Sequence, residues 1–312
     1  MTNQPFLQEV ENDSGLNNLK STQDWLKENK IFIELKLEEH GAIIFKDLPV
    51  KTAEDFDQFV STFNYETFTY EESLSNAVRI NKTDKVFTAN EAPREVEIFL
   101  HHEMAQTPTY PKNIFFFCKS ASETGGETPL CRSDQLYEAL LKADKALVES
   151  FEKFGVIYNS IMSSGDELIS GQGRSWQKTL GVSSKNDAEE KLSKLGYSWN
   201  WIEDDNLSVT TKTLQATKEL GNGQKSFFNQ VIAASLGWKK NSENQIAPVR
   251  FGNGEEIKES YIELISELAQ SLTLLRSWQD HDILLIDNYR VMHGRKPFAG
   301  NKNREVLVSL TN

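Results

Sequence analysis

Apolar residues gather in short runs near the start of the chain, and these runs predict a strand followed by a helix. Residues 41–48 (GAIIFKDL) are apolar and rich in β-branched side chains, which is typical of a buried strand. Thr52 is followed three residues later by Asp55, as in a capping box, so we expect a helix from there to about Phe63. Residues 1–15 are polar and are expected to be flexible.

Strands dominate the middle of the chain. The apolar pattern predicts strands at residues 96–104, 113–120, 127–132 and 155–162. The sequence TGGE at 124–127 indicates a turn before the third of these strands, and a helix is expected from Ser133.

The second half of the chain contains a polar stretch and, after it, a long stretch with helical periodicity. Residues 163–226 are polar, carry Gly residues and acidic pairs, and are interpreted as an insertion, or lid, over the core with a helix at 187–195. Residues 257–278 show the 3.6-residue period and are expected to form the longest helix, before closing strands at 282–286 and 305–310. The pattern therefore predicts a single α+β domain over residues 1–312, built on a closed or sandwiched sheet with flanking helices.

Composition narrows the possible functions. The 312 residues carry 34 basic and 46 acidic side chains, a net charge of −12 that argues against nucleic-acid and anionic-membrane partners. No apolar run is long enough to span a bilayer, and the first residues lack a secretory signal, so a cytoplasmic location is expected. Cys118 and Cys131 are expected to be reduced thiols. A monomer and a homodimer fit the sequence equally well.

One histidine-rich motif can carry metal chemistry. If residues 96–104 form a strand, His101 and Glu103 lie on one face and His102 on the other, so a third ligand must come from elsewhere, with His293 as the candidate. Two histidines and one carboxylate suit a non-haem Fe(II) oxygenase and leave positions for a bidentate oxo-acid and O2. The same ligands suit zinc. The motif alone is weak evidence for a metal site, because charged strand edges and polar residues with satisfied hydrogen bonds are common.

A second feature concerns an arginine near the C-terminus. Arg304 follows His293 by eleven residues, with Pro297 and Gly300 between them, and a loop of that size predicts two strands side by side. A guanidinium there can grip the distal carboxylate of a dicarboxylate, and the Thr128 hydroxyl can assist it. The simpler interpretation is a surface arginine and an ordinary strand threonine.

Several blocks, in order, resemble the TauD/TfdA-like oxygenases, in particular their clavaminate-synthase-like branch. The similar blocks span residues 40–310 and are GAIIFKDLPVKTAEDFDQFV, LHHEMAQTPTYPKNIFFFCKSASETGGETPL, GRSWQKTLGV, FFNQ and ILLIDNYRVMHGRKPF followed by Arg304. The resemblance implies a double-stranded β-helix, or jelly-roll, core with flanking helices. It also implies dependence on Fe(II), 2-oxoglutarate and O2.

The resemblance also implies a role for each matching residue. His101, Glu103 and His293 match the metal ligands, while Thr128 and Arg304 match the residues that hold 2-oxoglutarate. Many relatives have Asp where this chain has Glu103, but Glu is the variant of the clavaminate-synthase-like group. The related halogenases lack this carboxylate, so Glu103 argues against halogenation.

Other residues leave two interpretations open. Asn229 and Gln230 either face the substrate or satisfy backbone groups near a strand end. Arg174 and Trp176 are either part of a lid or a solvated arginine and a packed tryptophan. Arg295 either holds a substrate carboxylate or forms a plain salt bridge.

The expected function is oxygenation of a small polar molecule. The resemblance suggests an amino acid, free or tethered to a carrier protein, that is hydroxylated at an unactivated C–H bond with release of succinate and CO2. Desaturation and epoxidation use the same site. Two other classes remain open: a zinc-dependent hydrolase with the same ligands, and a non-catalytic jelly-roll binding protein.

Overall fold

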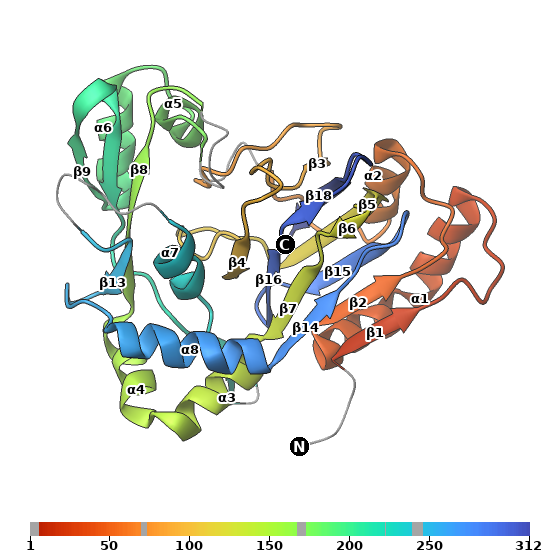
Figure 1. Ribbon diagram of the computed structural model, residues 1–312. Coiled ribbons are helices and arrows are strands. Elements are labelled where there is room, and N and C mark those ends of the chain that lie inside the picture. Colours follow the sequence, from red (N-terminus) through yellow and green to blue (C-terminus); the bar gives the residue numbers. More distant parts are fainter. Residues whose placement is uncertain (1–5, 70–73, 167–172, 222, 239–245) are drawn as a thin grey trace.

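A six-stranded sheet forms one wall of the fold in the computed structural model, which describes residues 6–69, 74–166, 173–221, 223–238 and 246–312 (Figure 1). Neighbouring strands in this sheet are antiparallel except β1 and β2. In spatial order the strands are β1 (Leu7–Val10), β2 (Ala42–Phe45), β15 (Ile283–Asp287), β5 (Asn113–Ser120), β18 (Glu305–Thr311) and β3 (Phe87–Thr88). This sheet includes the predicted strands at 41–48, 113–120, 282–286 and 305–310.

A second antiparallel sheet packs against the first. Its order is β14 (Thr273–Arg276), β7 (Thr128–Arg132), β16 (Val291–Arg295) and β4 (Ile98–His101). Ile44, Phe116 and Leu284 of the first sheet share one apolar core with Leu130 and Val291 of the second. Two antiparallel sheets around a common core confirm the predicted α+β fold with a jelly-roll centre.

Alternation along the central strands explains why they are buried on both faces. Ile43, Phe45 and Leu285 point to the opposite side from the core between the sheets and pack under α1 (Leu19–His40) and α2 (Ala53–Ser61). Figure 1 shows these two helices beside β1 and β2 at one edge of the molecule. The predicted capping box begins α2, with Thr52 and Asp55 exchanging hydrogen bonds.

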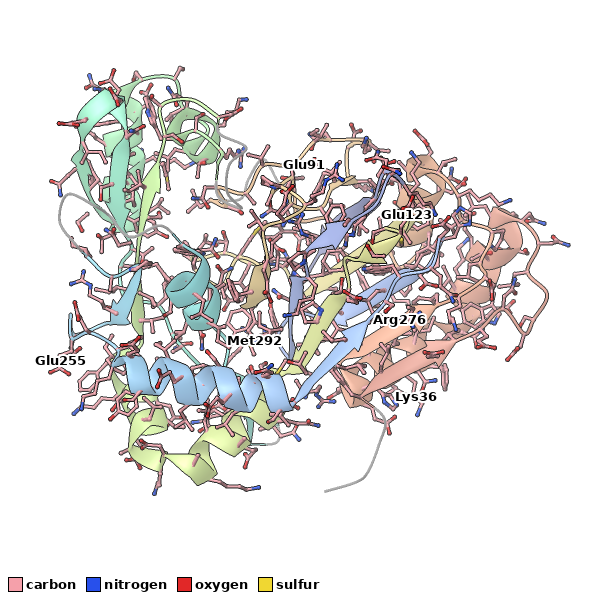
Figure 2. All side chains as sticks on the ribbon, in the orientation of Figure 1. Lys36, Glu91, Glu123, Glu255, Arg276 and Met292 are labelled. Atoms are coloured by element: carbon pink, nitrogen blue, oxygen red, sulfur yellow. The ribbon has the colours of Figure 1, made fainter. Side chains whose placement is uncertain are left out.

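Four other helices cover the second sheet and meet in a separate apolar core. They are α3 (Ser133–Ala143), α4 (Lys145–Phe154), α7 (Val231–Gly237) and α8 (Glu259–Ser271). Met292 of β16 belongs to this core and lies between β16 and the helices α7 and α8 (Figure 2). Because side chains alternate along a strand, the next residue, His293, faces the other way.

The described residues from 173 to 210 build most of a lobe beside the jelly roll, drawn in green in Figure 1. Within it lie α5 (Trp176–Leu180), α6 (Lys185–Leu195), β9 (Ser198–Trp201), the short helix η1 (Glu203–Asp205) and β10 (Leu207–Thr210). A third sheet joins the lobe to the body, in the order β13 (Val249–Phe251), β8 (Val156–Met162), β10 and β9. Residues 167–172 and 222 of the predicted insertion lie outside the described residues.

Two short antiparallel pairs complete the structure. β11 (Lys218–Gly221) pairs with β12 (Gln224–Ser226), and β6 (Thr124–Gly125) pairs with β17 (Phe298–Ala299). Cys118 and Cys131 are free, buried thiols as expected, and burial raises the pKa of each to about 12. No helix in the described part of the chain is long and apolar enough to cross a membrane.

Four sequence expectations need correction. Residues 7–10 were expected to be flexible, but they form β1 against β2. The longest helix is α1, with 22 residues, whereas 257–278 holds α8 and then turns into β14. The strand expected at 96–104 ends at His101. Finally, β16 and β18 lie in different sheets and are not neighbours, so the loop between His293 and Arg304 crosses from one sheet to the other.

The capping box gives a test of local stability. Thr52→Ala removes the hydroxyl that accepts from the Asp55 N–H at 3.0 Å, and we expect a loss of about 1 kcal/mol in the free energy of unfolding. Thr62→Ala at the other end of α2 is the matched control, because its hydroxyl bonds only a carbonyl of its own helix. Urea denaturation should show a change below about 0.5 kcal/mol for the control. Equal losses of unfolding free energy in the two variants would contradict the role of Thr52 as the N-cap of α2.

Candidate metal centre and adjoining cavity

Strand pairing brings together the two histidines that the sequence singled out. β4 and β16 are neighbours, and His101 lies directly opposite His293 in their register. The two ring centroids are 4.4 Å apart, and Nε2 of His293 lies 3.5 Å from Oε2 of Glu103. One possible ligand atom from each of the three residues lies within 4.8 Å of the others. The three side chains can therefore meet at one ion.

Glu103 reaches the histidines from a turn, not by alternation along a strand. The strand ends at His101, and Met104 adopts a φ of 58° in the turn that follows. Asn288 holds this turn on both sides: its Oδ1 accepts from the Glu103 N–H at 2.8 Å, and its Nδ2 donates to the Glu103 carbonyl at 3.1 Å. His102 points away, as predicted, and its Nδ1 contacts the Asn288 carbonyl.

The hydrogen bonding of His101 prepares it for a metal. Its Nδ1 lies 2.8 Å from the Phe99 carbonyl, so that nitrogen carries the proton and Nε2 keeps the lone pair for coordination. Burial, followed by the charge of His293, lowers the pKa of His101 to about 4. The ring is therefore neutral near pH 7, which is the form that binds a metal ion.

Arg79 is a residue of this centre that the sequence did not reveal. Its Nη2 donates to Oε1 of Glu103 at 2.8 Å, and the side chains of the pair are 6% and 5% exposed. Burial acts to raise the pKa of Glu103, but the adjacent charge of Arg79 and the hydrogen bond from His293 hold it well below its usual range. Arg79 lies in a segment without helix or strand, so no periodic pattern could have pointed to it.

The three candidate ligands line a cavity of about 310 Å³, and so do Thr128 and Arg304. Nη2 of Arg304 donates to the Gly126 carbonyl at 3.3 Å, and its guanidinium lies 5.2 Å from the Phe298 ring centroid. A Cβ at Gly126 would lie 2.9 Å from Nε of Arg304, so the glycine makes room for the arginine. Nε of Arg304 is buried without a hydrogen-bond partner among the described residues.

Thr128 is oriented by a tryptophan. Nε1 of Trp278 donates to the Thr128 hydroxyl oxygen at 2.9 Å. The indole occupies an acceptor position of the hydroxyl, which leaves its proton available to a different acceptor. Thr128 thus offers a hydrogen-bond donor on the wall of the cavity that it shares with Arg304.

The two amides of FFNQ differ in their positions. Nδ2 of Asn229 donates to the Ala216 carbonyl and its Oδ1 accepts from the Val231 N–H, so this side chain serves the backbone and does not line the cavity. Gln230 does line the cavity, although its Nε2 donates to the His102 carbonyl at 2.9 Å.

Arg295 lines the cavity, and its contacts do not include the plain salt bridge that was one of its two interpretations. Its two terminal nitrogens donate to the carbonyls of Asn90, Ala92, Pro93 and Val96, and no carboxylate faces it at salt-bridge distance among the described residues. Arg295 therefore fixes the loop at 90–96, which forms part of the cavity wall. Burial, followed by the charge of Arg304, lowers its pKa to about 10.

The two candidates from the insertion lie outside this cavity. Trp176 is 4% exposed, donates from Nε1 to the Asp205 carbonyl and packs on Trp201, so it belongs to the core of the lobe. Nη1 of Arg174 donates to the Ser75 carbonyl at 3.3 Å, and Ser75 itself lines the cavity.

The donor set fits Fe(II). Two imidazole nitrogens and one carboxylate oxygen form the ligand set of non-haem iron oxygenases, and the half-buried Arg304 on the same cavity suits an oxo-diacid. Comparisons with known proteins point the same way. Residues 7–310 match the model of the family described as taurine catabolism dioxygenase TauD, TfdA family. The chain belongs to the TauD/TfdA family, whose members are non-haem dioxygenases that depend on Fe(II) and 2-oxoglutarate.

Two relatives and one solved structure extend this result. The chain is 32% identical over 286 residues to a clavaminate synthase-like protein of Arabidopsis thaliana, covering 91% of this chain and 86% of that protein. It is 28% identical over 289 residues to the dapdiamide synthesis protein DdaC of Enterobacter agglomerans, covering 88% and 83%. A putative alpha-ketoglutarate dependent 2,4-D dioxygenase from Burkholderia xenovorans shares the fold, with a TM-score of 0.55, 14% identity and coverage of 100% and 95%.

The buried pair of Arg79 and Glu103 gives a test without turnover. Arg79→Gln removes the guanidinium that Glu103 faces, and breaking a buried pair costs about 3–5 kcal/mol. A bound divalent cation restores the missing positive charge. We therefore expect Mn(II) to raise the melting temperature of Arg79→Gln more than that of the parent protein.

The matched control for this variant is Arg132→Gln. It breaks another nearly buried pair, with Asp134, away from the cavity. The control should lose stability but show the parental shift with Mn(II). An equal Mn(II) shift in all three proteins would contradict the role assigned to Arg79.

Proposed function

We propose that this protein hydroxylates an unactivated C–H bond of a small polar substrate, an amino acid either free or tethered to a carrier protein. The observation that carries the proposal is the meeting of His101, Glu103 and His293 within 4.8 Å on the wall of a cavity that also holds Arg304. A cavity of about 310 Å³ lies at the lower end of the range for ligand sites and favours small molecules.

Each residue has a distinct part in this proposal. His101, Glu103 and His293 would hold the metal. Bound Fe(II) supplies O2 activation, coupled to the oxidative decarboxylation of 2-oxoglutarate to succinate and CO2. Arg304 holds the distal carboxylate of 2-oxoglutarate through its guanidinium, and the Thr128 hydroxyl donates to the same carboxylate. No side chain needs to act as a general base.

The other functional classes explain fewer observations. A zinc hydrolase gives no task to Arg304, whose buried Nε lacks a partner among the described residues. A binding module gives no task to three converging ligands. The family comparison also supports oxygenase chemistry. The relative named for dapdiamide synthesis supports a substrate from small-molecule biosynthesis.

The metal ligands give the first test of this proposal. His101→Ala and His293→Ala each remove one of three ligands, so we expect loss of bound Fe(II) and of succinate release from 2-oxoglutarate. His281→Asn is the control: it removes an imidazole outside the cavity, and asparagine tolerates the φ of 74° at this position. Iron content by metal analysis is the primary measurement. Either alanine variant with full iron content and full activity would overturn the assignment.

Arg304 gives a second and separate test. Arg304→Gln should raise the KM for 2-oxoglutarate on the order of 30-fold, which corresponds to about 2 kcal/mol for a lost buried charge contact. Iron content should be unchanged, because the ligands remain. Arg94→Gln is the control, since Arg94 is exposed and donates to the carbonyl of Gly300 in the same loop. An unchanged KM for 2-oxoglutarate would contradict the role of Arg304.

A further inference from the structure

The cavity beside the metal centre has two walls that differ in charge. The charged side chains that line it come from the jelly-roll side and the segments next to it. Among the described residues from 156 to 238, none that lines the cavity is charged; the polar ones are Asn159, Ser160, Ser163, Asn206 and Gln230. This neutral wall is formed by β8, the insertion, and α7 with the residues that flank it. The two walls therefore favour different chemical groups.

A small side cavity of about 30 Å³ adjoins the main cavity and is lined in part by the insertion. The two cavities share Asn76, Gln106, Ser160 and Trp238 among their lining residues. Tyr197 of the insertion lines the side cavity but not the main one. Gln106 and Tyr197 therefore border the same small cavity next to the one that holds the metal centre.

Two polar atoms at this side cavity are buried and have no hydrogen-bond partner among the described residues. They are the hydroxyl of Tyr197, a residue that is 8% exposed, and Oε1 of Gln106. An unsatisfied buried polar atom costs about 1–3 kcal/mol, so each of the two calls for a partner. Burial also raises the pKa of Tyr197, which keeps the phenol protonated.

The two atoms require opposite partners. The Tyr197 hydroxyl has a proton to donate, whereas a carbonyl oxygen such as Oε1 of Gln106 can only accept. A ligand that satisfies both must accept one hydrogen bond and donate another. A carboxamide does so with its C=O and N–H groups. A carboxylate has no proton to donate to Oε1 of Gln106, and an ammonium group has no lone pair to accept the proton of the Tyr197 hydroxyl.

The absence of charge among the described residues of this wall also favours a neutral carboxamide over a carboxylate or an ammonium group. A carboxylate or ammonium group at the neutral wall would be buried without an opposite charge, at a cost of several kcal/mol. None of the described residues that line the side cavity is charged, and Arg174, which contacts the Ser75 carbonyl, lines neither cavity. A neutral amide incurs no such cost.

The insertion holds Tyr197 firmly. Gly196 ends α6 in the left-handed conformation, and the Tyr197 N–H donates to the Leu192 carbonyl at 3.0 Å. Leu180, Leu192 and Leu207 share one buried core with Tyr197. The position of the hydroxyl is therefore set by the packing of the lobe and not by a free loop.

We propose that the substrate carries a neutral carboxamide, and that this group binds between Tyr197 and Gln106 while the carbon to be oxidised lies at the metal centre. The proposal rests on the oxygenase function proposed above and specifies its substrate class. It assigns the choice of substrate to the insertion and to the segment around Gln106.

The activity test compares matched small molecules. Succinate release is measured with Fe(II) and 2-oxoglutarate in air, without addition and with L-asparagine, L-aspartate, L-glutamine, L-glutamate, glycinamide, 2,4-diaminobutyrate, and the primary amides and acids of N-acetylated amino acids. We expect amides to stimulate release over the substrate-free rate at least about tenfold more than the matched acids and amines. Equal stimulation, a preference for acids or amines, or no stimulating amide would overturn the proposal.

Two variants test the residues. Tyr197→Phe and Gln106→Met should each lower the ratio of amide to acid stimulation about tenfold. Tyr137→Phe is the matched control, because it also removes the hydroxyl of a buried tyrosine but one that donates to Glu152 outside the cavity. The control should keep the parental ratio. An unchanged ratio in Tyr197→Phe and Gln106→Met would contradict the assignment.

A binding test does not depend on turnover. Crystals of the protein soaked in acetamide should show its carbonyl at the Tyr197 hydroxyl and its nitrogen at Oε1 of Gln106, whereas crystals soaked in acetate should show no anion there. Water alone at this position after the acetamide soak would overturn the proposal, as would equal binding of acetate. If the enzyme releases no succinate under any condition, the oxygenase proposal fails, and the acetamide soak still decides the nature of this subsite.

Discussion

The burial of one carboxylate, Glu103, sets the arrangement of the whole site. A buried negative charge is tolerated only beside positive charge or several hydrogen-bond donors. Here Arg79 faces one carboxylate oxygen and His293 the other, and the side chain of Glu103 is 5% exposed. Asn288 holds the backbone of the same residue from both sides. A divalent cation adds the charge that makes this environment favourable, so metal binding and local stability are linked.

The two sheets decide where this carboxylate can meet its partners. The pairing of β4 with β16 places His101 opposite His293, and alternation along β16 directs Met292 into the helical core and His293 into the cavity. Crossing from β16 to β18 then brings Arg304 to the same cavity from the other sheet. The jelly roll thus supplies the two histidines from one sheet and Glu103 from the turn after it, while the candidate 2-oxoglutarate anchor directly precedes a strand of the other sheet.

Local sequence patterns predicted part of this arrangement, for identifiable physical reasons. The capping box at Thr52 and the apolar strand at 113–120 depend on neighbouring residues only, and both are confirmed. The helix α1 was missed because Ile31, Phe32 and Leu35 are exposed and blur its apolar stripe. Periodicity beyond Ser271 suggested more helix, although those apolar residues belong to a turn and to β14.

Long-range contacts were harder to predict. The meeting of His101 with His293 could be foreseen from the resemblance to a family, whereas Arg79 and Asn288 leave no signal in the sequence around them. The four backbone carbonyls that hold the Arg295 guanidinium also left no signal in the sequence. Residues that act through tertiary contacts can be identified only in the folded structure.

The difference between the two cavity walls follows from what each wall must do. In the proposed function the jelly-roll wall holds a cation, a carboxylate ligand and a dianionic cosubstrate, which accounts for Arg79, Glu103 and Arg304 on this wall, and the ion pair of Arg79 with Glu103 fixes those two side chains. The opposite wall has no such demand and can vary with the substrate alone. Its amides and hydroxyls discriminate by the direction of hydrogen bonds, which separates an amide from an acid of nearly the same shape. Specificity can therefore change in the insertion without disturbing the groups that hold the metal.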